Sequence, residues 1–178
     1  MVSIIPLAGL PEVQPGDDLA ALLGDAVERA GGLEEGDVLV VAQKAVSKAE
    51  GRVEQTDDVV ATILREARAV RRRRGDLVIA ETKHGFVCAS AGVDKSNAPG
   101  EDWIVLLPED PDASASRIRS ALGERLGQEP VVIVSDSFGR AWRQGKNRRI
   151  HRPAGSAATR ASAFWWIGFR APRPRHCR

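Results

Sequence analysis

Residues 131–137 of the sequence read VVIVSDS, an apolar run that ends in a carboxylate and a hydroxyl. A continuous apolar run of this kind predicts a β-strand covered on both faces. The turn beyond such a strand is where α/β proteins present side chains to a ligand, so Asp136 and Ser137 are predicted to lie in an exposed turn. An Asp in that position is also typical of an ordinary turn or capping residue.

The segments before this run alternate between strand and helix patterns. Residues 2–5 (VSII) and 37–43 (DVLVVAQ) are predicted strands. Between them we predict a helix behind Asp17 and Asp18, acids suited to a helix start. Its apolar residues recur at helical spacing at Leu19, Leu22, Leu23 and Val27. The fold class is therefore predicted to be α/β or mixed α+β.

A second helix is predicted to begin at about Asp57 and to end in RRRR (71–74) and Gly75, because basic residues and glycine are favoured at helix C-termini. The alternative for the arginine run is a nucleic-acid patch. The apolar stripe of this helix comprises Val59, Val60, Ile63, Leu64, Ala67 and Val70.

Three more strands and one more helix complete the pattern. Residues 77–82 and 86–90 flank KHG as a hairpin, and residues 103–108 form another short strand. Asp110 and Pro111 then open a helix, because proline suits the first helical turn. This helix places Ile118, Leu122 and Leu126 on one face and ends at Gly127.

Composition excludes some classes of protein and divides the chain in two. The 178 residues are 43% hydrophobic, enough for a core, but no apolar stretch approaches the roughly 20 residues of a spanning helix. We therefore expect a cytoplasmic protein without a membrane partner. Residues 1–136 have a net charge of −9, whereas residues 137–178 contain 11 Lys and Arg and no acid.

Two carboxylates are candidates for a shared metal site. Asp94 lies in a polar cluster, AGVDKSN (91–97), and with Asp136 and Ser137 it offers the oxygen ligands that Mg²⁺ or Mn²⁺ prefers. Cations for phosphates are available at Lys44 and Lys48, with Arg140 and Arg143 after Asp136. The chain contains neither G-x-x-x-x-G-K-[ST] nor G-x-G-x-x-G. A nucleotide would therefore bind without a standard phosphate loop.

Together these stretches resemble a known family. The motifs GLPEVQPGDDL, EGDVLVVAQKAVSKAEGR, ETKHGFVCASAGVDKSN, LLPEDPDAS and VSDSFGRAWRQG occur in this order over about residues 2–145. They are similar to those of the coenzyme F-420 gamma-glutamyl ligase family, which includes the N-terminal domain of bifunctional actinobacterial members. The resemblance implies a ligase that uses GTP and a divalent metal, with potassium as a further cation. It would join L-glutamate to a deazaflavin precursor through an acyl phosphate and extend the chain by gamma-linkages, as a homodimer at full length and without a specific nucleic acid.

The resemblance also implies site residues. Asp94, Asp136 and Ser137 match the metal ligands of the family, with Ser137 where threonine is usual. The segment Leu10, Pro11, Glu12 and Val13 matches residues that contact the nucleotide. Gln43, Lys48 and Asn97 match further GTP positions, and Gln43 departs from the small hydroxyl residue often found there. No residue is assigned a catalytic role.

The resemblance ends near Gly145, which divides the chain into a ligase-like domain at 1–145 and a divergent tail at 146–178. The tail is rich in Arg, Ala and Pro and lacks acids, as expected for a GC-rich gene read out of frame. Two alternatives to an active ligase follow: an inactive, truncated or frameshifted family member, and a nucleic-acid-binding module with a basic arm. We predict that the 178-residue chain alone has no detectable ligation activity.

Overall fold

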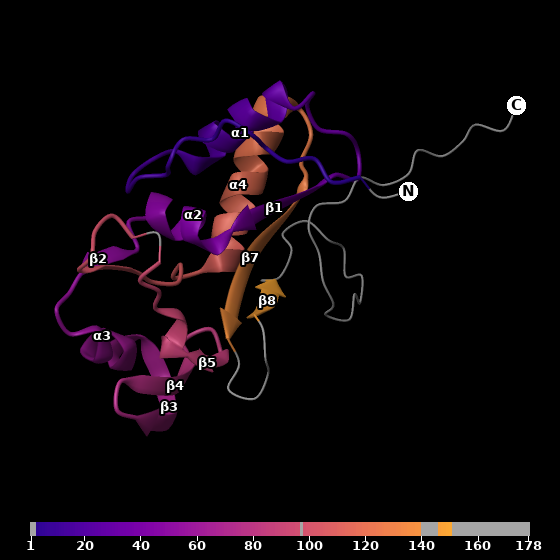
Figure 1. The fold of residues 1–178 in the computed structure, drawn as a ribbon. Helices are drawn as coiled ribbons and strands as arrows, with labels where there is room; N and C mark the ends of the chain where they lie inside the picture. The colour runs from indigo at the N-terminus through magenta and orange to yellow at the C-terminus, as the bar shows by residue number, and fades with distance from the viewer. Residues whose placement is uncertain (1–2, 97, 140–145, 151–178) are drawn as a thin grey trace, which may run out of the picture.

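The chain folds around a small central sheet. The computed structural model describes residues 3–96, 98–139 and 146–150. Strand β1 (Val38–Ala42) pairs in parallel with β7 (Val131–Gly139), and β7 pairs antiparallel with β8 (Lys146–Ile150). Two helices, α1 (Leu19–Arg29) and α4 (Pro111–Leu126), lie together against this sheet (Figure 1). The α/β class predicted from the sequence is confirmed.

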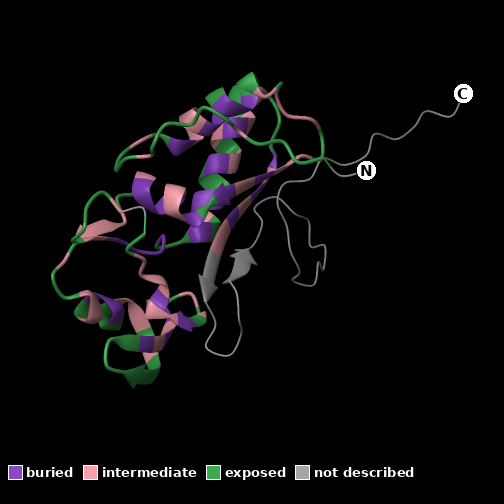
Figure 2. Cartoon of the chain, in the orientation of Figure 1, coloured by how far each residue is buried: buried purple, intermediate pink, exposed green. Residues whose placement is uncertain are grey.

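The core lies between the two helices and one face of the sheet. The register pairs Leu39 with Val132 and Val41 with Val134, and all four side chains are buried against helix residues such as Leu122. In Figure 2 the buried positions concentrate along these elements. The opposite face of β7 is half-buried at Val131, Ile133 and Ser135, so the strand predicted to be covered on both faces is covered fully on one face and partly on the other. The reason is that α1 and α4 pack on the face that carries the core residues.

Caps fix the ends of the helices where the sequence predicts them. The Asp18 carboxylate accepts the backbone N–H of Ala21 at 3.0 Å, and the Asp110 carboxylate accepts that of Ala113 at 2.9 Å. Each bond satisfies an N–H that has no partner within the helix. Gly127 ends α4 in the left-handed region at φ 72°. Among the described residues, no helix combines the length and the apolarity needed to cross a bilayer.

Two smaller sheets complete the described structure. Helix α2 (Gln43–Ala49) follows β1 directly, and β2 (Val53–Gln55) pairs with β6 (Trp103–Val105). The second small sheet has the order β3 (Ala67–Arg74), β4 (Leu77–Thr82), β5 (Val87–Ala89), and the pairing of β4 with β5 confirms the predicted hairpin over KHG. A short 3-10 helix, η1 (Ser90–Gly92), leads from β5 toward Asp94.

The arginine run is in a strand, not at a helix end. Helix α3 (Val59–Glu66) stops before it, and β3 (Ala67–Arg74) pairs antiparallel with β4. Exposed arginines suit a helix end and an edge strand equally, so pairing with the β4 backbone decides between them. Gly75, at φ 58°, makes the turn between β3 and β4 rather than a helix C-cap.

The predicted first strand is also wrong. Residues 3–5 form no strand, Ile4 and Ile5 are 53% and 44% exposed, and Val2 lies outside the described residues. Only two apolar residues, Ile4 and Ile5, precede Pro6 in the described chain, and Pro6 has no N–H to donate, so this segment offers a sheet few pairing positions. This segment instead runs beside β1 and lines a cavity with it.

The end of β7 differs from the prediction as well. Asp136 and Ser137 lie within the strand rather than in a turn beyond it, because β7 continues past its last pair with β1, Ala42 with Ser135. Beyond that point β8 supplies the backbone partner, and Asp136 pairs in register with Arg149. The first five residues of the predicted tail, 146–150, are thus part of the central sheet.

Candidate functional site

Helix α2 carries the two lysines of the candidate site. It starts immediately after β1, and Lys44 and Lys48 stand four residues apart, a spacing that places both on one face of a helix. Each lysine contacts a carboxylate from a distant part of the chain. One helix therefore joins the loop around Asp94 to the N-terminal segment around Glu12.

The first pair is Lys44 with Asp94. The Lys44 Nζ lies 2.9 Å from Asp94 Oδ2, donates to the Ser96 carbonyl at 3.1 Å and also donates to the Ser96 hydroxyl. The other carboxylate oxygen accepts the Ser96 backbone N–H at 2.7 Å. Hydrogen bonds in both directions between the backbones of Asp94 and Val105 fix the loop against β6. The carboxylate is thus held at a defined place while its side chain remains 44% exposed.

The charge of Asp94 follows from these contacts. Burial by itself would raise the pKa of the carboxyl group. The Ser96 N–H and the Lys44 ammonium outweigh burial and hold the pKa of Asp94 below its ordinary value. Asp94 is therefore an anion at neutral pH, as a metal ligand must be.

The second pair is Lys48 with Glu12. The Lys48 Nζ lies 3.0 Å from Glu12 Oε1, with the lysine side chain 10% and the glutamate side chain 70% exposed. The backbone N–H of Gly16 donates to the Ala49 carbonyl at 3.0 Å, which ties the N-terminal segment to the end of α2. Two of the residues predicted to contact GTP are thus in direct contact with each other.

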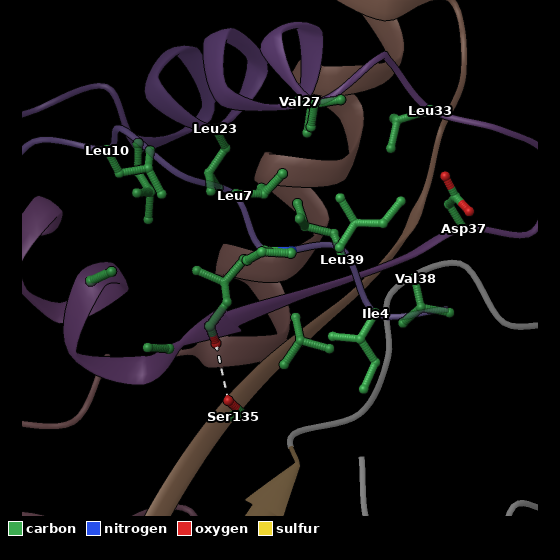
Figure 3. Close-up of a pocket in the computed structure, with 18 of the residues that line it drawn as sticks. Ile4, Leu7, Leu10, Leu23, Val27, Leu33, Asp37, Val38, Leu39 and Ser135 are labelled. Atoms are coloured by element: carbon green, nitrogen blue, oxygen red, sulfur yellow. Dashed lines mark hydrogen bonds between the residues drawn. The ribbon is translucent and has the colours of Figure 1, made fainter. Parts of the chain in front are cut away.

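Leu10 and Val13 of the same segment line a cavity of about 520 Å³ (Figure 3). Its walls are mainly apolar side chains from the N-terminal segment, α1 and β1, and Ser135 lies at its edge on β7. The Ser135 hydroxyl donates to the Val41 carbonyl at 3.5 Å. Pro11 is exposed and is not part of the cavity wall.

Gln43 is placed differently from the other predicted GTP residues. It is 4% exposed, and its amide nitrogen donates to the Ser47 hydroxyl at 2.6 Å and to the Leu106 carbonyl at 3.2 Å. These contacts connect α2 to the residue after β6. The structure thus gives Gln43 an internal role, and a contact with GTP stays a prediction.

The remaining predicted residues follow β7 and the Asp94 loop. Asp136 is half-buried beyond the end of β1, Ser137 is the next residue of β7, and Asn97 lies outside the described residues. Within the described ranges, no group of three or more His, Cys, Asp or Glu side chains is close enough to hold a metal ion. Two carboxylates nevertheless suit Mg²⁺, which commonly takes one or two carboxylates together with phosphates and water.

The sequence did not lead us to two residues that contact Asp94, namely Lys44 and Ser96. Lys44 was considered for phosphates, not for Asp94, and Ser96 had no predicted role. The short spacing of Asp94 and Ser96 was a usable signal, because an Asp side chain commonly accepts the N–H two residues later. The pairing of Lys48 with Glu12 had no such signal, since 36 residues separate them.

Comparisons with known proteins agree with the motifs. A family model described as F420-0:Gamma-glutamyl ligase matches residues 9–62 and 55–150. The coenzyme F420:L-glutamate ligase of Methanopyrus kandleri is 43% identical, with 75% of this chain and 59% of the relative aligned. The ligase of the same name from Methanothermobacter thermautotrophicus is 38% identical, covering 81% of this chain and 65% of the relative.

A third relative of the same name, from Haloarcula marismortui, is 35% identical over 97% of this chain and 69% of its own length. This alignment covers more of the chain than residues 2–145, so it extends into the segment after Gly145. The chain spans about three fifths to two thirds of the length of the first two relatives.

Proposed function

Because the chain belongs to the F420-0:gamma-glutamyl ligase family, we propose that it carries the GTP and metal sites of a coenzyme F420:L-glutamate ligase. The observation that carries this proposal is the position of α2. Its two lysines contact Asp94, a proposed metal ligand, and Glu12, in the proposed nucleotide segment. The proposed metal ligand and the proposed nucleotide segment thus both contact the same helix, which supports the proposal.

The reaction proposed has two chemical steps. A carboxylate oxygen of the deazaflavin precursor attacks the γ-phosphorus of GTP, and GDP leaves as an acyl phosphate forms. The amine of L-glutamate then attacks the acyl carbon, phosphate leaves, the amine gives up a proton, and an amide bond forms. Repetition on the γ-carboxyl group of the added glutamate gives gamma-linkages.

The roles of this chain's own residues follow from their contacts. Asp94 and Asp136, with the Ser137 hydroxyl, would hold Mg²⁺ or Mn²⁺, which neutralises charge on the phosphates of GTP. Lys48 is fixed at low exposure beside Glu12, where an ammonium interacts strongly with a phosphate. Lys44 keeps Asp94 in place and ionised. Potassium and a homodimer at full length remain part of the proposal as the family resemblance implies them.

Calorimetry with GTP in the presence of manganese and in EDTA tests the nucleotide and metal sites. We expect GTP to bind only with the divalent cation, because Asp94 and Asp136 would otherwise face the phosphates as like charges. An equal affinity for GTP in EDTA would contradict the metal assignment. The same measurement on the Asp136→Asn variant tests whether Asp136 is a metal ligand or a structural residue. Weaker metal-dependent binding by a folded variant is expected for a ligand.

Two further measurements separate an active ligase from the inactive family member. A ligation assay with GTP, manganese, glutamate and the deazaflavin acceptor distinguishes the two: amide formation by the 178-residue chain supports an active ligase, and no turnover supports the inactive family member. The coding DNA after the Gly145 codon, read in another frame, is expected to encode Thr-Asp and then an Ala/Gly/Ile-rich stretch. Turnover by the chain, or no such frame, would make the basic segment a working part of the protein.

A further inference from the structure

The outer face of the sheet β3–β4–β5 carries a row of arginines. The register sets Arg72 opposite Ile79 and Arg74 opposite Leu77. Paired residues on adjacent strands point to the same face of a sheet. Val78, the residue between Leu77 and Ile79, is fully buried in a core cluster, so Leu77 and Ile79 point the other way. Arg72 and Arg74 therefore point outward with them.

Positive charge is in excess on this face. Arg68 and Arg71 both contact Glu81, with Arg68 Nη1 3.4 Å from the carboxylate. Within the described part of the chain, no carboxylate lies in ion-pair range of Arg72 or Arg74, and one exposed acid, Asp76, stands at the turn. Two guanidinium groups are thus available to an anion.

Exposed apolar side chains share this face with the arginines. Leu77, opposite Arg74, is 56% exposed, and Val87, opposite Glu81, is 45% exposed. A basic edge strand by itself is explained by its ability to prevent edge-to-edge pairing between copies. That explanation does not account for large exposed apolar residues on the neighbouring strands. The face has the chemistry of a surface that contacts an anion with an aliphatic backbone.

The chain connects this sheet to the candidate site through β5 and η1. Arg72, Ile79 and Ala89 form one row across the three strands. With a strand spacing of about 5 Å, Arg72 stands about 10 Å from Ala89. Ala89 is followed by η1 and, five residues along the chain, by Asp94. Ala91 and Val93 pack against Val78 and Ala80, on the face of the sheet opposite to the arginines. A gamma-glutamyl chain that begins near Asp94 therefore has to pass around the edge of this sheet to reach Arg72 and Arg74.

We propose that this face binds the growing gamma-glutamyl chain through Arg72 and Arg74, an inference that rests on the proposed function. Each glutamate joined through its γ-carboxyl group keeps a free α-carboxylate, so the product becomes a polyanion with methylene groups between the charges. Guanidinium groups bind carboxylates with two parallel hydrogen bonds. The exposed leucine and valine contact the methylene groups. The face thereby holds an acceptor during repeated addition.

Binding of a γ-linked tetraglutamate peptide to the full 178-residue chain tests this proposal. Calorimetry is done at low ionic strength without GTP or metal, so failure of the nucleotide site does not affect the result. The Arg72→Gln/Arg74→Gln variant is expected to bind about fivefold to tenfold more weakly, because two exposed charge contacts are lost. Glu81→Gln is expected to bind more tightly, because it releases Arg68 and Arg71.

A matched control removes the same charge elsewhere. Arg117→Gln/Arg119→Gln changes two arginines of α4, which lies away from the hairpin in Figure 1, and is expected to leave the affinity within twofold. An equal loss of affinity in this control, or no loss in Arg72→Gln/Arg74→Gln, overturns the proposal. Tighter binding of a single-stranded oligonucleotide than of the peptide also overturns it and assigns the arginines to nucleic acid.

Discussion

Helix α2 and the β3–β4 hairpin both display basic side chains, but they use them differently. On α2, Lys44 and Lys48 each contact a carboxylate that comes from a distant segment. On the hairpin, Arg68 and Arg71 share Glu81, which is on the adjacent strand, while Arg72 and Arg74 contact no carboxylate among the described residues. The dense arginine run is therefore the less constrained region, and the two spaced lysines organise the site.

The largest expected effect is on the proposed metal-dependent binding of GTP, whose proposed residues include Lys48 of α2 and Asp94, which contacts Lys44 of α2. Asp94→Asn and Asp136→Asn are each expected to weaken binding of GTP with manganese by at least about tenfold, because an amide lacks the negative charge with which a carboxylate attracts a divalent cation. Calorimetry measures the affinity, and far-UV circular dichroism should be unchanged. An unfolded Asp136→Asn variant would identify that carboxylate as structural instead.

The next prediction distinguishes the contribution of the buried aliphatic stem of Lys48 from the contribution of its charge. Lys48→Ala is expected to lower the free energy of unfolding by about 1–2 kcal/mol, because the aliphatic stem is buried. Lys48→Met keeps the stem, so its stability should stay within about 0.5 kcal/mol while its affinity for GTP falls. Urea unfolding and calorimetry on both variants provide the comparison. Normal GTP binding by Lys48→Met would remove this lysine from the nucleotide site.

A smaller effect concerns the pH dependence of stability through Asp94. Its pKa is lower in the folded chain than the ordinary value of 3.8. Ionisation of Asp94 therefore stabilises the fold above about pH 4, and this contribution is lost as the pH falls through the lower, folded pKa. The difference in unfolding free energy between the wild type and Asp94→Asn should shrink over that acidic range.

The Lys44→Met variant controls this measurement. Without the ammonium, the pKa of Asp94 should rise toward its ordinary value, so the acid-dependent part of the stability becomes smaller. Urea titrations at several pH values measure both variants. The same pH dependence in Lys44→Met as in the wild type would show that the Ser96 N–H alone sets the pKa.

The smallest effect is expected on the hairpin. Arg72→Gln should change the free energy of unfolding by no more than about 0.5 kcal/mol, because the side chain is exposed. Arg52→Gln is the contrasting variant, since Arg52 contacts Glu66 at 3.0 Å and donates to the Leu107 carbonyl at 3.0 Å. Arg52→Gln is expected to lower the free energy of unfolding by about 1–3 kcal/mol. Equal effects of the two variants would contradict the distinction between constrained and available arginines.

Local signals predicted most of the elements correctly. The acids before α1 and α4, the proline at the start of α4 and the glycine after α4 act on neighbouring backbone groups, so their effect is visible in the sequence. The hairpin over KHG was equally local. Residues 67–74 and 2–5 were mispredicted because their patterns fit more than one structure, and a partner strand, present for β3 and absent for residues 3–5 among the described residues, made the choice.

The sequence by itself determined the α/β class, the caps and the motifs that establish the family, because these depend on short spacings along the chain. Only the tertiary structure decided that β7 continues through Asp136, that Lys44 contacts Asp94 and that Lys48 contacts Glu12. The physical reason is the distance along the chain. The two lysine contacts join residues separated by tens of positions, and β7 beyond Ser135 pairs with a strand that comes later in the chain. The energies of these contacts depend on a geometry that the packed sheet and helices create.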